Sequence, residues 1–76
     1  SDVSEEVLAE IKSDPKLKRI PVIVLSGSNA PQDIAACYDL HANCYIVKPL
    51  HLNSMTEMIR SLVDFWLVRV KLPVDL

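Results

Sequence analysis

A serine and a lysine follow two short apolar runs in this 76-residue chain. Ser26 comes directly after Val22–Leu25, and Lys48 comes directly after Cys44–Val47. If both runs are parallel strands, their carboxyl ends form the edge of a sheet where ligands usually bind. A hydroxyl donates one hydrogen bond, and an ammonium group supplies charge and three more donors. The pair therefore suits an anion, and the N-terminus of a following helix would add backbone N–H groups.

The elements that would position these residues alternate along the chain. Val22–Leu25 is continuously apolar, which is typical of a strand covered on both faces in a parallel sheet. A Ser-x-x-Glu capping box at 54–57 begins the last helix. Helical periodicity predicts helices over residues 4–13 and 31–41 and from 54 onward. The order helix, strand, helix, strand, helix predicts an α/β fold with a parallel sheet.

Two short strands are too few for a stable sheet. A two-stranded sheet is marginal in water, and ordering costs about 1.5 kcal/mol per residue. The Val22–Leu25 strand has the composition of a central strand, yet the sequence offers no second neighbour for it. We therefore expect the second half of a larger domain, completed by dimerisation or strand exchange.

Composition excludes several classes of function. Half of the residues are hydrophobic, and eight basic residues against ten acidic ones give a net charge of −2, which argues against disorder and nucleic-acid binding. No apolar run approaches the ~18–20 residues of a membrane span, and residues 1–6 do not resemble a secretory signal. The connector 15–20 carries three positive charges, typical of a solvated loop and less often of a docking patch. Two cysteines suggest a reducing cytoplasm.

Four potential zinc ligands lie close together in the sequence. They are Cys37, His41, Cys44 and His51. Cys37 and His41 share a helical face, but Cys44 begins a predicted buried strand, and the spacing fits no common zinc ribbon or finger. We expect two core cysteines, two surface histidines and no bound metal.

The pattern around the two strand ends resembles the receiver domain of two-component response regulators, a CheY-like, flavodoxin-like fold. A strand ending in Ser26 is followed by a helix and by Tyr45-Ile46-Val47-Lys48-Pro49, and Lys48 follows Ser26 by 22 positions. The resemblance implies that Ser26 and Lys48 contact a phosphoryl group carried on an aspartate. It also implies that Tyr45 is an aromatic switch and that the bond before Pro49 is cis. The alternative for Tyr45 is a buried strand tyrosine whose hydroxyl has a hydrogen-bond partner.

The resemblance is closer to single-domain regulators that partner phytochrome-type histidine kinases, and it covers essentially the whole chain. The segments that carry it are 7–15, 20–25, 38–40, 42–46 and 65–67. It implies a cytoplasmic phosphorelay and a histidine kinase partner. It also implies that residues 1–76 are a partial receiver domain, from its third helix to its last.

Departures from the receiver pattern limit what the chain does alone. By the resemblance, the phospho-accepting aspartate and the acidic pair that holds magnesium would precede Ser1. Asp2, Glu5 and Glu6 flank a helix start rather than a strand end, so they do not replace these groups. We expect an inactive, non-enzymatic portion without a cofactor of its own, whereas the parent domain would bind magnesium. His41 stands where the family usually has glycine, and a left-handed backbone there would be strained. We interpret His41 as a local departure from the family without a function of its own.

The last helix carries more apolar residues than one core face needs. The excess at Phe65–Val68 (Phe65, Trp66, Leu67 and Val68) indicates a homodimer interface. The main alternative to a receiver portion is a degenerate receiver-like interaction module that folds only as a dimer. Nucleophilic chemistry by Ser26 and Lys48 is a third reading, which would need an oxyanion hole that the sequence does not indicate.

Overall fold

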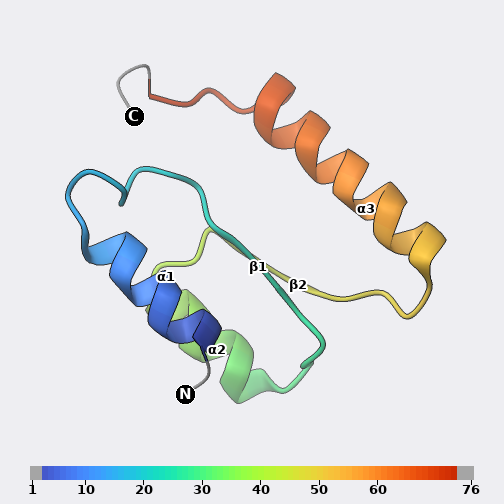
Figure 1. Cartoon of the computed structure of the whole chain (residues 1–76), viewed down its shortest axis with the longest axis horizontal. Helices are drawn as coiled ribbons and strands as arrows, with labels where there is room; N and C mark the ends of the chain where they lie inside the picture. The colour runs from blue at the N-terminus through green and yellow to red at the C-terminus, as the bar shows by residue number, and fades with distance from the viewer. Residues whose placement is uncertain (1–2, 74–76) are drawn as a thin grey trace.

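The computed structural model describes residues 3–73 and has the predicted order of elements (Figure 1). The elements are α1 (Val3–Ser13), β1 (Ile23–Ser26), α2 (Pro31–Asp39), β2 (Cys44–Val47), α3 (Leu52–Asp64) and the π-helical turn η1 (Phe65–Arg69). Pro31 opens α2, where its missing N–H costs no hydrogen bond. The predicted bounds of the second strand are confirmed, and β1 lies one residue further along than predicted.

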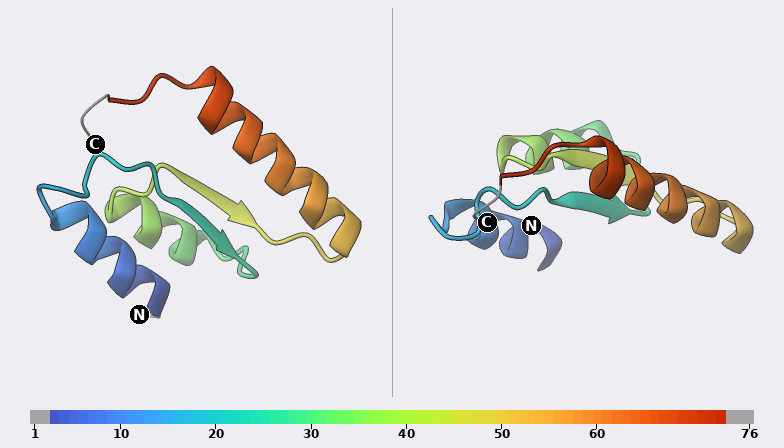
Figure 2. Two further views of the ribbon diagram at one scale, coloured as in Figure 1. Left: turned by 45° about the horizontal axis from the view of Figure 1, so that its top comes forward. Right: turned by 90° about the horizontal axis from the view of Figure 1, so that it is seen from above.

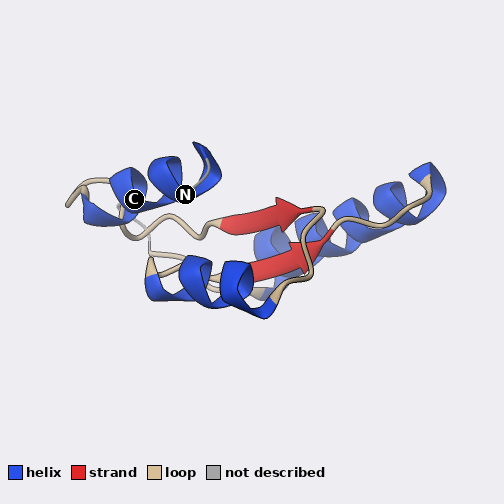
Figure 3. Cartoon of the chain, turned by 90° about the horizontal axis from the view of Figure 1, so that it is seen from below, coloured by secondary structure: helices blue, strands red, loops and turns tan. Residues whose placement is uncertain are grey.

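The sheet is two-stranded and parallel, as predicted. Ile23 pairs with Cys44, and Ser26 pairs with Val47. The strands lie between α1 and α2 on one side and α3 on the other (Figures 1 and 2). Figure 3 shows both arrows pointing the same way, with α2 crossing between their opposite ends. The arrangement is the helix-covered parallel sheet of an α/β fold.

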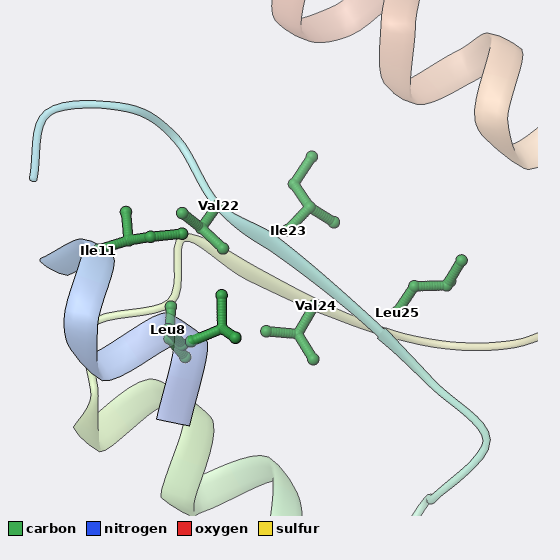
Figure 4. Close-up of a pocket in the computed structure, with 7 residues that line it drawn as sticks. Leu8, Ile11, Val22, Ile23, Val24 and Leu25 are labelled. Atoms are coloured by element: carbon green, nitrogen blue, oxygen red, sulfur yellow. The ribbon is translucent and has the colours of Figure 1, made fainter. Parts of the chain in front are cut away.

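The buried core lies on the side of α1 and α2. It consists of Leu8, Val24, Cys37 and Ala42, with Leu8 only 2% exposed. Figure 4 shows Val24 pointing toward Leu8, whereas Ile23 and Leu25 point to the opposite face of β1. This alternation is the period of two expected of a strand, and both of its faces are apolar.

The outer edge of β1 is open. Among residues 3–73, β1 pairs with β2 alone. A groove of about 150 Å³ follows this edge, between α1 and β1 (Figure 4). Its lining is apolar, from Val7, Leu8, Ile11, Val22, Ile23, Val24 and Leu25. The edge has the character of a strand that is central in a larger sheet.

The start of α3 differs from the prediction, and the backbone after the end of α2 is left-handed. The prediction that a capping box at 54–57 begins the last helix is wrong. The helix α3 begins at Leu52, with His51 as its N-cap and without a side-chain capping bond. Ser54 therefore lies inside the first turn, and the Thr56 hydroxyl donates to the carbonyl of Leu52 at 3.1 Å. The left-handed conformation of His41 is confirmed, with a φ of 70° just after α2.

Candidate functional site

The parallel pairing brings the backbones of Ser26 and Lys48 together at the carboxyl edge of the sheet. Ser26 ends β1, and the Lys48 N–H, directly after β2, donates to the Ser26 carbonyl at 2.7 Å. Ser26 is half-buried and Lys48 is exposed. The predicted placement of both residues at one edge is therefore confirmed. Their contact with an anion remains a prediction.

Ser28 fixes the loop that follows Ser26. Its N–H donates to the Ser26 hydroxyl oxygen at 3.1 Å, which leaves the single Ser26 O–H proton able to donate elsewhere. The Ser28 hydroxyl donates to the Asp33 carboxylate in the first turn of α2, and it accepts from the Ala30 N–H at 3.2 Å. Both bonds anchor the loop to the start of α2.

Tyr45 is connected to Ser26 through Ser28. Its hydroxyl donates to the Ser28 carbonyl at 2.8 Å, and its half-buried side chain packs against the core. The Tyr45 N–H donates to the Tyr38 hydroxyl at 3.2 Å. The predicted switch residue therefore touches the loop of the predicted anion-contacting hydroxyl.

Sequence reasoning did not single out Ser28. The available signal was a polar break directly before a helix, with Pro31 in its first position and an acid, Asp33, in its first turn. A serine upstream of such a start can hydrogen-bond the exposed N–H groups and a nearby carboxylate. Its contact with Tyr45 depends on the register of β2 beside β1, which the local sequence does not specify.

The prediction of a cis peptide bond before Pro49 is wrong for this structure. No cis peptide bond occurs in residues 3–73, so the Lys48–Pro49 bond is trans. Trans is lower in free energy by ~0.5–1 kcal/mol unless packing selects cis. Leu50, the next residue, is 96% exposed, so little packing acts on this turn.

The four potential zinc ligands are placed in different surroundings. Cys37 is buried in the core and Cys44 is half-buried on β2, and neither forms a disulfide. His41 and His51 are exposed. Within residues 3–73, no three histidine, cysteine or acidic side chains lie close enough together to hold a metal ion.

The same range contains no helix with the length and apolar character of a membrane span.

The apolar residues predicted as a dimer interface lie in η1, at the end of α3. Phe65, Leu67 and Val68 are 54%, 72% and 67% exposed, and Trp66 is half-buried. The rings of Phe65 and Trp66 meet edge to face, with centroids 5.7 Å apart. Three adjacent apolar side chains are therefore exposed to solvent.

No family model matches the chain, but individual relatives do. The chain is 50% identical, over 68 residues, to response regulator Rcp1 of Synechocystis sp., covering 90% of this chain and 46% of Rcp1. The Mn²⁺-bound form of Rcp1 matches with a TM-score of 0.84 and 48% identity, over 92% of this chain and 50% of Rcp1.

A second solved structure is the phosphorylated cyanobacterial phytochrome response regulator RcpA. It matches with a TM-score of 0.88 and 54% identity, over 91% of this chain and 49% of RcpA. The chain thus spans about half the length of the relatives it matches. These matches favour a response regulator over a degenerate dimeric module. The chain is a portion of a response regulator receiver domain with the CheY-like fold.

Proposed function

We propose that residues 1–76 form the part of a two-component receiver domain that contacts the phosphoryl group. The Ser26 hydroxyl donates a hydrogen bond to a phosphoryl oxygen, and the Lys48 ammonium group balances its charge. The observation that carries the proposal is the position of both residues at one edge of a parallel sheet. The bond from the Lys48 N–H to the Ser26 carbonyl, at 2.7 Å, holds their backbones side by side.

The whole receiver would accept phosphate from a histidine kinase, of the phytochrome type, in the cytoplasm. The relatives support this: RcpA is described as phosphorylated and as a phytochrome response regulator. The accepting aspartate would come from receiver residues other than these. The whole receiver would bind magnesium through residues other than these, and the metal in the Mn²⁺-bound structure of Rcp1 supports a divalent ion in the whole domain. We propose no enzymatic activity for this chain.

Tyr45 would report the state of the phosphoryl group to partners. The Ser26 hydroxyl oxygen accepts from the Ser28 N–H, and the Ser28 carbonyl accepts from the Tyr45 hydroxyl, so a movement of Ser26 toward the phosphoryl group would be passed to Tyr45. Tyr45→Phe removes that hydroxyl and keeps the ring. In a chimera in which this chain replaces the matching part of RcpA, we expect the variant to accept phosphate at an unchanged rate but to show a smaller phosphorylation-dependent change in the NMR signals of α2 and β2. A change as large as in the unmodified protein would contradict the role of Tyr45.

A chimera tests the roles of Ser26 and Lys48. This chain replaces the matching part of RcpA, with which it shares 54% identity. We expect Mg²⁺-dependent aspartyl-phosphate formation from acetyl phosphate. Lys48→Gln should slow it about 10- to 100-fold, because a charge-assisted contact contributes ~1.5–3 kcal/mol. Ser26→Ala should slow it less.

The control variant is Lys71→Gln, which removes the same charge after the end of η1. It should leave the phosphorylation rate unchanged. Folding of each variant is checked by circular dichroism. A folded Lys48→Gln chimera with the rate of the parent chimera would refute the proposal. The 76-residue chain alone should form no aspartyl-phosphate and bind no beryllofluoride.

We also propose that η1 is a contact surface between two copies of this chain. Its exposed apolar side chains support this, since such patches are typical of interfaces. Leu67→Glu places a charge in the patch and should shift sedimentation from dimer to monomer. Leu50→Glu is the matched control, because Leu50 is 96% exposed before the other end of α3. Equal sedimentation of both variants would contradict the surface.

A further inference from the structure

We propose that a basic hollow at the amino edge of the sheet binds an acidic segment of a protein partner. The hollow has a volume of about 460 Å³. Its lining residues are Lys12, Lys18, Arg19, His41 and Asn43. They come from the end of α1, from the connector before β1 and from the turn before β2. The hollow therefore lies at the opposite edge of the sheet from Ser26 and Lys48.

Positive charge is concentrated here in a chain of net charge −2. Four of its eight lysines and arginines lie between positions 12 and 19. The Lys12 ammonium group donates to the carbonyls of Lys18, at 3.1 Å, and Ile20, at 2.7 Å. These bonds hold the connector against the end of α1, and Lys12, Lys18 and Arg19 line the same hollow. A fixed cluster of cations attracts an anionic partner.

His41 adds a hydrogen-bonding side chain to the lining of the hollow, and its own backbone is in a strained conformation. Its φ of 70° lies in the left-handed region, which glycine adopts without strain. The exposed imidazole lines the hollow and also an adjoining one. The left-handed backbone belongs to the end of α2, where the Ala42 N–H donates to the Cys37 carbonyl at 3.1 Å. The binding role therefore rests on the position of the imidazole in the lining of the hollow.

The extent of the surface favours a peptide over a small ion. The adjoining hollow shares Lys12 and His41 and adds Ala9, Ser13, Asp39 and Leu40. Cations thus stand beside a small apolar area, which suits a segment that mixes carboxylates with small apolar side chains. The Asp39 carboxylate repels acidic residues at that end, so we expect the carboxylates to lie beside Lys18 and Arg19.

Titration with a hexaglutamate peptide tests the site, followed by NMR of the 15N-labelled 76-residue chain. We expect shifts confined to residues 17–20 and 40–43 and weaker binding as salt rises. Lys18→Gln and Arg19→Gln should each lower the affinity about threefold, as for exposed ion pairs. Lys16→Gln removes the same charge from the same connector but outside the lining, and it should have less than half that effect.

Three results would overturn the proposal. They are shifts spread over the whole chain, an equal loss of affinity in Lys16→Gln, and inorganic phosphate that binds as tightly as the peptide. Lys48→Gln should leave hexaglutamate binding unchanged, so failure of this site and failure of the phosphoryl-contacting edge are distinguishable.

His41→Gly separates binding from stability. Relief of the left-handed strain should raise the midpoint of thermal unfolding, while loss of the imidazole should weaken hexaglutamate binding about twofold. A merely structural histidine would move the midpoint alone. An unchanged affinity in this variant would therefore refute the binding role of His41.

Discussion

Replacement of Leu8 by alanine tests the core directly. Leu8 is 2% exposed and packs with Val24, Cys37 and Ala42. The change removes three carbon groups, which is worth about 2.4 kcal/mol of transfer free energy. In an enclosed core, the cavity left behind raises such losses toward ~5 kcal/mol. Here Leu8 also lines the open groove beside β1, so solvent can enter the space. We therefore expect a loss of about 2.5–3 kcal/mol.

Urea unfolding followed by circular dichroism measures this loss in the 76-residue chain. Leu50→Ala is the matched control, because it makes the same chemical change at a side chain that is 96% exposed. It should alter the free energy of unfolding by less than ~0.5 kcal/mol. Equal losses in the two variants would refute the assignment of the core to the α1 side of β1.

Two further changes test particular hydrogen bonds and caps. Asn43→Ala removes the side-chain oxygen that accepts from the Val22 N–H at 2.7 Å, and it should lower the free energy of unfolding by about 1 kcal/mol. Asn29→Ala, in the exposed loop after β1, serves as its control, and an equal loss there would contradict the role of Asn43. His51→Asp places a capping carboxylate at the uncapped start of α3 and should raise the free energy of unfolding by about 0.5–1 kcal/mol. A lower thermal midpoint would show that His51 is not the N-cap.

The sequence was sufficient where local patterns and chain geometry agree. The apolar runs predicted two parallel strands, and the order of elements placed Ser26 and Lys48 at one edge of their sheet. The left-handed backbone of His41 was suggested only by the resemblance, because the family usually has glycine at this position. For the strands, a local pattern decides the conformation, and tertiary packing reinforces it.

Features that depend on tertiary contacts were not predictable in this way. The Ser-x-x-Glu pattern at 54–57 is common inside helices, so it did not identify the start of α3 at Leu52. The link from Tyr45 through Ser28 to Ser26 requires the register of two strands separated by a helix. The trans bond before Pro49 reflects an exposed turn, which the residue types alone do not reveal.

The position of β1 connects the stability of the sheet with the proposed role of its carboxyl edge. Both faces of β1 are apolar, and within residues 3–73 only β2 pairs with it. A strand of this kind is most stable with neighbours on both sides, because one edge otherwise leaves its backbone groups to solvent. A parallel neighbour at the open edge would also place its own carboxyl end beside Ser26, opposite Lys48. The same strand pairing would therefore complete the core beside Leu8 and bring a third residue to the anion-contacting edge.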